Sequence, residues 1–432
     1  MRENCQIHLR IVINIFLFYF NFKFYMNIIN QLKKNVFSLI SIQALNIISP
    51  LILIPLYIKH LSIEVYGLYA LSLALSAFAQ IIIIYGFNFT ANRAISVSKS
   101  KIEIQKIISS TRTTQFFLFL ICLFFFTFIS YFFGKGDKFI VLVFLNILTF
   151  IHQILYPQWL YHGFNEISTL KNISFIHKII LTVLAATLIP IFKIVELIPV
   201  VIITSSILTY FFLKLIKILK PEFRFYLKFI TFKDILKELQ NGYSLFISQL
   251  VSQVYVYSPK IILGLFLPLS SIALFDISEK ILKIAKVPQY MLNQAFFPLL
   301  SRDYNLKIKK TFELRSFFLS IILVLIFVFF SDLIFSLFID DIKTNLIFFK
   351  IMSVSLIFVF MSSYNGPLGL VILKKDSLWT KSTLFGLYAF VALISILIIT
   401  DLVTLLNFAL VIVFAELIVY LFSKKFLNDV SV

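Results

Sequence analysis

The sequence predicts an all-α polytopic membrane protein with about twelve transmembrane helices in two six-helix bundles, related by a parallel pseudo-twofold repeat. Hydrophobic residues make up 60% of the 432 residues and charged residues only 14%, and the mean hydropathy is +0.98. Soluble globular domains contain about 25% charged residues, so this composition excludes that class. Apolar runs of about twenty residues, long enough to cross a bilayer as a helix, recur along the chain.

The predicted spans and domains follow from the positions of these runs. The spans cover residues 36–57, 66–89, 114–133, 139–161, 169–190, 198–218, 242–264, 272–297, 315–338, 346–373, 379–399 and 402–422. They divide the chain into an N-terminal segment (1–35), an N-terminal bundle (36–218), a basic cytoplasmic linker (219–241), a C-terminal bundle (242–425) and a cytoplasmic tail (426–432). Residues 1–25 are interpreted as a mis-started upstream stretch, because Met26 precedes a more natural beginning, or as an interfacial helix.

Basic residues gather in alternate connections, namely those after spans two, six, eight and ten, and in the C-terminal tail. Lys and Arg accumulate on the cytoplasmic side of membrane proteins, so these segments and both termini are expected to be cytoplasmic. The net charge of +19 follows this distribution and does not indicate a nucleic-acid partner. The remaining connections are short, which leaves no extracytoplasmic domain to carry enzyme chemistry.

An internal duplication appears when the chain is aligned with itself at an offset of 206 residues. Residues 35–39 (NVFSL) then match 241–245 (NGYSL), Gln43 matches Gln249 and Leu61 matches Leu267. A constant offset between two six-span halves predicts a repeat with the same orientation in the membrane.

The segment 275–286, FDISEKILKIAK, places five charges on one face of a predicted helix. At 100° per residue they share an arc of about 120°; they are Asp276, Glu279, Lys280, Lys283 and Lys286. Charged side chains inside a membrane face protein or a watery cavity, which makes this face a candidate binding surface. The alternative is a structural role for two i,i+4 ion pairs, Asp276–Lys280 and Glu279–Lys283.

The duplication matches the charged face with small or uncharged residues of the first half. Ala70, Ala74 and Ala77 occupy the positions of Asp276, Lys280 and Lys283. A small-residue stripe opposite a charged face leaves room for a cavity between the halves, or it allows close helix packing.

Two further cations extend the predicted site. Lys260 follows Pro259 within a span and, with Lys280, Lys283 and Lys286, forms a cationic patch suited to phosphate. Snorkelling, or pairing with Asp276 or Glu279, is the alternative for Lys260. Arg93, at the end of span two, is either a cytoplasmic entry contact for phosphate or an ordinary positive-inside residue.

Enzymatic and metal chemistry find no support in the sequence. The two cysteines form no CxxC motif, the five histidines are scattered, and no P-loop, G-x-S-x-G or H-E-x-x-H motif occurs. We therefore expect neither a metal site nor an enzyme. Glu416 lies inside the last predicted span.

Three stretches carry a resemblance to a known family: residues 41–96, residues 258–281, and YPQWLYHGFNE with Pro157, Trp159 and Gly163. Over residues 30–425 the chain resembles the Wzx-type O-antigen and polysaccharide flippases of the multidrug/oligosaccharidyl-lipid/polysaccharide exporter superfamily. The resemblance implies that an undecaprenyl-diphosphate-linked oligosaccharide, an O-antigen or capsule repeat unit, crosses the bacterial inner membrane by alternating access.

The resemblance also sets expectations for the site and its partners. The cationic lumen would engage the diphosphate and sugar, and proton or sodium coupling would use Asp276 or Glu279, with no other cofactor. Polymerase and chain-length proteins of the same pathway are the expected partners. The alternative function is a cation-coupled antiporter of drugs or small metabolites from the same superfamily, although a Lys-rich cavity disfavours cationic drugs.

Overall fold

The computed structural model describes residues 38–216, 221–223, 230–302, 306–339 and 346–431, and every regular element in these ranges is a helix. The predicted all-α membrane fold is confirmed. The predictions for residues 1–35, including the mis-started stretch, lie outside the described residues.

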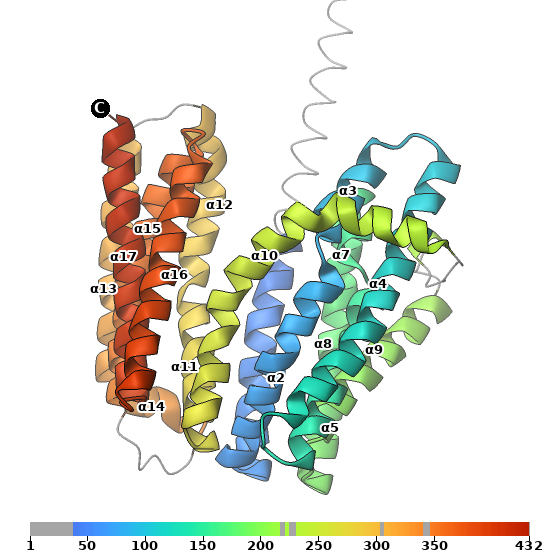
Figure 1. Ribbon diagram of the computed structural model, residues 1–432, viewed down its shortest axis with the longest axis horizontal. Helices are drawn as coiled ribbons and strands as arrows, with labels where there is room; N and C mark the ends of the chain where they lie inside the picture. The colour runs from blue at the N-terminus through green and yellow to red at the C-terminus, as the bar shows by residue number, and fades with distance from the viewer. Residues whose placement is uncertain (1–37, 217–220, 224–229, 303–305, 340–345, 432) are drawn as a thin grey trace, which may run out of the picture.

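The N-terminal half consists of helices that lie side by side at the right of Figure 1. They are Ser38–Leu61, α2 (Ile63–Ile84), α3 (Phe87–Val97), α4 (Lys101–Tyr131), α5 (Asp137–Leu148), α6 (Ile151–Leu155), α7 (Gln158–Gly163), α8 (Ile167–Phe192) and α9 (Leu197–Leu215), followed by the short η1 (Pro221–Phe223).

The C-terminal half begins with two helices in the middle of Figure 1 and continues into a bundle at its left. Its elements are α10 (Phe232–Phe266), α11 (Leu269–Ala285), α12 (Val287–Arg302), α13 (Leu306–Phe329), α14 (Ser331–Ser336), α15 (Ile347–Asn365), the π-helical turn η2 (Gly366–Val371), α16 (Asp376–Ile399) and α17 (Leu405–Ser431).

Ten helical segments in the described ranges are long and apolar enough to cross a membrane, and each corresponds to a predicted span. The two predicted spans without such a segment, 242–264 and 272–297, fall on α10 and on α11–α12. Within α10, the stretch Val256–Phe266 is a shorter apolar segment that contains Lys260. Helices α11 and α12 have 17 and 16 residues, and α10 and α11 carry the residues of the predicted charged site.

Three boundaries differ from those predicted. The linker is partly helical, because α10 begins at Phe232 after a capping box in which Thr231 and Asp234 hydrogen-bond each other. The span 272–297 divides after Ala285, and Pro288 lies in the first turn of α12, where the missing N–H is tolerated. Helix α17 runs on through the predicted tail to Ser431.

The helix boundaries agree with the 206-residue repeat. Helix α2 begins at Ile63 and α11 at Leu269, which are 206 residues apart. The helices that precede them end at Leu61 and Phe266, within one residue of the same offset. Equivalent helices of the two halves therefore have equivalent ends, as a parallel repeat requires.

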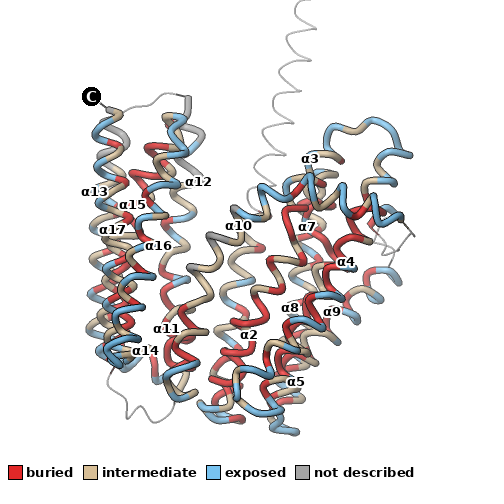
Figure 2. The backbone as a smooth tube through the Cα atoms, in the orientation of Figure 1, coloured by how far each residue is buried: buried red, intermediate tan, exposed pale blue. Residues whose placement is uncertain are grey.

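Helix α2 lies at the centre of the packing, with 14 of its 22 residues buried, and Figure 2 shows this burial along the helix. It packs against α10 and α11 of the other half. A Cβ on Gly67 would lie 1.9 Å from the carbonyl oxygen of Leu269, and one on Gly264 would lie 2.4 Å from a Leu71 methyl. Glycine at these positions therefore permits the close contact between the halves.

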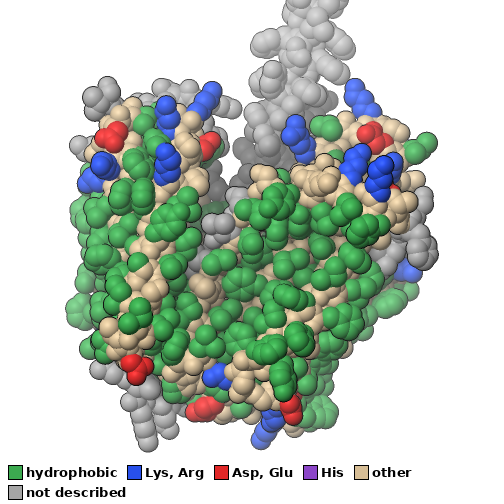
Figure 3. Space-filling model, viewed as in Figure 1, with side chains coloured by type: hydrophobic (Ala, Val, Ile, Leu, Met, Phe, Trp, Pro, Cys, Tyr) green, Lys and Arg blue, Asp and Glu red, His purple; other side chains and the backbone are tan. Residues whose placement is uncertain are grey.

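Polar and apolar side chains are segregated along the molecule. Hydrophobic side chains cover the flanks, whereas Lys and Arg gather mainly at the upper end (Figure 3). Exposed phenylalanines such as Phe124 and Phe128 belong to this apolar belt. The distribution is typical of a protein whose flanks contact lipid.

Candidate functional site

Asp276, on α11, lies at the centre of a buried charged cluster. Its side chain is fully buried, and its Oδ1 accepts a hydrogen bond from Lys260 Nζ of α10 at 2.5 Å. Its Oδ2 accepts from Lys280 Nζ and from the Tyr66 hydroxyl of α2, both at 2.6 Å. Three donors from three helices thus satisfy one carboxylate, as burial of a charge requires.

Glu279 provides the second carboxylate of the cluster. Its Oε2 lies 2.7 Å from Lys260 Nζ, and its Oε1 lies 2.8 Å from Lys283 Nζ. Lys260 therefore bridges Asp276 and Glu279. The cluster combines three ammonium groups with two carboxylates, so one positive charge remains if all five groups are ionised.

The helical repeat accounts for part of this geometry. Both predicted i,i+4 ion pairs are present, with Asp276–Lys280 at 2.6 Å and Glu279–Lys283 at 2.8 Å. Lys260 adds the contact between helices, because α10 continues through Pro259 and holds the lysine against α11. In this structure Lys260 pairs with Asp276 and Glu279, which was the alternative interpretation of Lys260 from the sequence.

Tyr66 belongs to the cluster, although no pattern in the sequence pointed to it. Its ring is fully buried, and its hydroxyl donates to Asp276 while accepting from Lys280 Nζ at 2.9 Å. A tyrosine at the start of a span is ordinary as an interfacial residue. The contact joins residues 210 positions apart, so only the packing of α2 against α11 reveals it.

A cavity of about 180 Å³ lies beside the cluster, between α10–α11 and the bundle of α15, α16 and α17. Its α11 wall contains Glu279, Lys283 and Lys286, and Glu416 of α17 also lines it. The Lys283 side chain is 46% exposed. Within the described ranges, no carboxylate lies within ion-pair distance of Lys286. The cavity thus offers exposed cations at a boundary between helix groups.

The structure divides the predicted site residues into three groups. Lys260 and Asp276 are buried and Lys280 lies partly buried beside them. Glu279, Lys283 and Lys286 border the cavity. Arg93 is exposed on α3, at the opposite end of Figure 1 from α11. It is therefore not brought to the cluster.

The small-residue stripe on α2 contributes to packing. Ala70, Ala74 and Ala77 are at most 5% exposed, and none of them lines the cavity beside α11. The close-packing alternative therefore describes this stripe, and the expectation that it borders a cavity was wrong for the one seen here.

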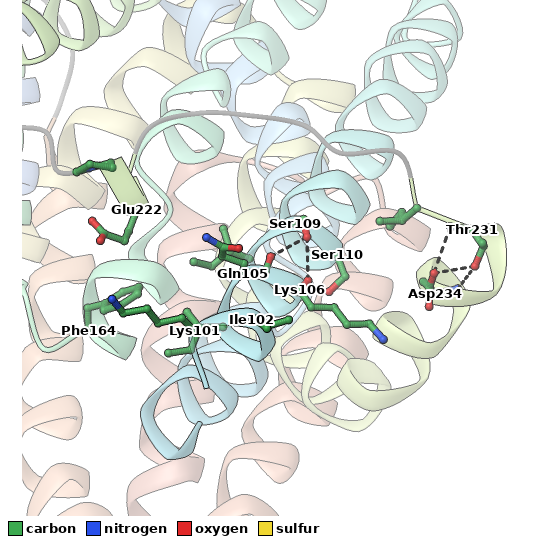
Figure 4. Close-up of a pocket in the computed structure, with 14 residues that line it drawn as sticks. Lys101, Ile102, Gln105, Lys106, Ser109, Ser110, Phe164, Glu222, Thr231 and Asp234 are labelled. Carbon is green, nitrogen blue, oxygen red and sulfur yellow. Dashed lines mark hydrogen bonds between the residues drawn. The ribbon is translucent and has the colours of Figure 1, made fainter. Parts of the chain in front are cut away.

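A larger cavity of about 970 Å³ lies at the basic end, between the first turns of α4 and α10 (Figure 4). Its lining includes Lys101 and Lys106 together with Glu222 and Asp234. Charges of both signs line it, and Asp234 accepts hydrogen bonds from Thr231. The cavity therefore has no clear preference for a charged ligand.

Comparison with known proteins shows that the chain matches a protein family. Residues 32–304, more than half of the chain, match the family described as "Polysaccharide biosynthesis protein". The chain belongs to this family. Two similar proteins are each named "Putative O-antigen transporter". The protein from Shigella dysenteriae is 26% identical over 284 residues, which cover 64% of this chain and 70% of the relative. The protein from Escherichia coli K12 is 25% identical over 150 residues, covering 34% and 36%.

Solved structures show the same fold for this polysaccharide biosynthesis family member. The lipid II flippase MurJ, in an inward closed conformation, superposes with a TM-score of 0.67 at 15% identity, covering 90% of this chain and 87% of MurJ. An inward-facing multidrug transporter of the MATE family and MOP superfamily gives 0.65 at 15% identity, with coverages of 88% and 94%. At such identities the likeness establishes the fold alone.

Proposed function

We propose that this protein is a flippase that moves an undecaprenyl-diphosphate-linked oligosaccharide, an O-antigen or capsule repeat unit, across the bacterial inner membrane. Membership of the polysaccharide biosynthesis family and the relatives named as O-antigen transporters support this proposal. The fold shared with a lipid II flippase is consistent with it. The process is transport, without covalent chemistry, and pathway polymerase and chain-length proteins are the proposed partners.

The observation that carries the proposal is the cationic wall of the cavity beside α11. Lys283 and Lys286 both border this cavity, and Lys286 has no carboxylate within ion-pair distance among the described residues. Ammonium groups bind phosphate oxygens as point charges. A diphosphate in the cavity would contact Lys286 and would compete with Glu279 for Lys283.

Alternating access would use the boundary on which this cavity lies. Helices α10 and α11 pack on α2, whereas α15, α16 and α17 form the opposite wall. We assign the basic end, with both termini, to the cytoplasm. Arg93, exposed on α3 at this end, is a proposed entry contact.

We expect a coupling proton or sodium ion to bind at Glu279 rather than at Asp276. Asp276 is fully buried and accepts from three donors, so a proton or sodium ion would have to displace them. The Glu279 side chain is 15% exposed and borders the cavity, where substrate contact with Lys283 would release one of its oxygens. Binding of phosphate would thereby be linked to binding of a cation at Glu279.

The test is complementation of a bacterial strain that lacks its own glycan flippase. We expect the double variant Lys283→Gln, Lys286→Gln to insert normally but to lower surface glycan by about tenfold or more, because each charge-assisted contact contributes about 1.5–3 kcal/mol. Lys381→Gln, an exposed lysine of α16 outside the cavity, is the matched control. Wild-type amounts of surface glycan in the double variant would refute the proposal.

A second function, cation-coupled antiport of drugs or small metabolites, is favoured by one observation. Glu279 and Glu416 line the same cavity and would attract a cationic substrate. In that case Glu416→Gln would abolish drug resistance conferred by the chain. Under the flippase proposal, wild-type protein confers no such resistance.

A further inference from the structure

A groove between the first helix and α8 lies apart from the charged cluster. It has a volume of about 740 Å³, within the range of small-ligand sites. Residues of Ser38–Leu61 form one wall, from Ser41 to Ile52, and residues of α8 form the other, from Lys171 to Val183. Each wall is about 16–18 Å long at 1.5 Å per residue. The groove therefore has an elongated shape.

The charge of the groove has one sign. Lys171 and Lys178 line it, and no carboxylate does. They are seven residues apart, so their directions on α8 differ by only about 20°. In the described part of the chain, the Lys178 ammonium has no hydrogen bond or ion pair. A cation in this position, facing a groove rather than a carboxylate, favours an anionic ligand.

The remaining lining is apolar or carries neutral hydroxyl and amide groups. Ile48, Ile52, Phe175, Ile179 and Val183 contribute large hydrophobic surfaces that are about half exposed. Such a surface beside two lysines matches an amphiphile with an anionic head and a hydrocarbon chain.

The depth of Lys178 distinguishes between two sources of such an amphiphile. Lys171 lies about 6 Å and Lys178 about 16 Å from the start of α8, a helix about 39 Å long. With a hydrocarbon core about 30 Å thick, Lys178 is near the middle of the membrane. The headgroup of a resident phospholipid stays at the interface, whereas the phosphate of a lipid in transit passes this depth.

We propose that this groove binds the polyprenyl diphosphate end of the transported glycolipid, with Lys171 as the first phosphate contact and Lys178 as the second. The isoprenoid chain lies along the apolar residues of the two helices. The proposal rests on the proposed flippase function and adds a second anion-binding site in the N-terminal half, separate from Lys283 and Lys286.

Direct binding of undecaprenyl diphosphate to the purified full-length chain tests the proposal. The protein is placed in nanodiscs of zwitterionic lipid, and the dissociation constant is measured for wild type and variants. We expect Lys178→Gln to weaken binding about tenfold, because one charge-assisted contact is lost. Lys178→Arg, which keeps the charge, should stay within about threefold of wild type. Lys59→Gln, exposed on the first helix outside the groove, should leave binding unchanged.

The outcomes separate this inference from the proposed function. If wild type binds and Lys178→Gln binds equally well, the groove assignment is wrong while the flippase proposal stands. If wild type does not bind undecaprenyl diphosphate at all, both fail. A parallel titration with phosphatidylglycerol tests the source of the phosphate: equal affinity with the same dependence on Lys178 would overturn the transit assignment in favour of a resident lipid.

Discussion

Replacement of Asp276 by asparagine tests the energetic role of the buried cluster. The carboxylate is fully buried and accepts from Lys260, Lys280 and Tyr66 at 2.5–2.6 Å. Asparagine keeps the shape but removes the negative charge. Removal of one partner from a buried ion pair costs about 3–5 kcal/mol, because the remaining charge is uncompensated.

The contacts that Lys260 and Lys280 keep after the substitution determine how large the loss of stability is within this range. Lys260 retains Glu279 at 2.7 Å, whereas Lys280 retains only the Tyr66 hydroxyl. We therefore expect Asp276→Asn to lower the free energy of unfolding by about 3 kcal/mol, the lower end of the range.

The loss of stability in Glu279→Gln is the comparison for Asp276→Asn, because both carboxylates belong to the same cluster. Lys260 then keeps Asp276, and the Lys283 side chain, 46% exposed, reaches solvent instead. Exposed ion pairs contribute about 0–1 kcal/mol, so the expected loss is about 1 kcal/mol. The difference between the two carboxylates follows from their burial.

The assay is reversible unfolding of the full chain in mixed detergent micelles, followed by circular dichroism. Adding Lys280→Met to Asp276→Asn should recover about half of the loss, because the uncompensated ammonium is removed. A stability of Asp276→Asn within about 1 kcal/mol of wild type, or equal losses for Asp276→Asn and Glu279→Gln, would refute this reasoning.

Two further predictions concern helix packing and capping. Gly67→Ala should destabilise by about 1–3 kcal/mol or more, because its Cβ would clash with the Leu269 carbonyl. Gly264→Ala should stay within about 1 kcal/mol, since its Cβ meets a side-chain methyl that can rotate and alanine favours the helix; equal losses in thermal unfolding would contradict the packing described. Thr231→Ala should cost about 1 kcal/mol by removing the cap that Thr231 shares with Asp234, and an unchanged unfolding midpoint would show that the cap contributes nothing.

Local pattern accounts for the parts of the fold and site that the sequence predicted. Hydropathy located the ten apolar spans, because burial in lipid selects apolar residues within each helix. The sequence also predicted spans over α10 and α11–α12, where the described residues hold no segment as long and apolar as the other ten. The charges of these helices were themselves the signal for a site. The 100° helical repeat placed Asp276 beside Lys280 and Glu279 beside Lys283.

The sequence by itself therefore determined the membrane class, the repeat and one charged helix face, since these depend on residues close together in the chain. Tertiary structure decided which charges meet other helices. Lys260 bridges two carboxylates, Tyr66 joins the cluster from α2, and Glu416 reaches the cavity from α17. Lys178 faces a groove that two helices form only together. Such contacts arise from the packing of distant helices, which no local pattern encodes.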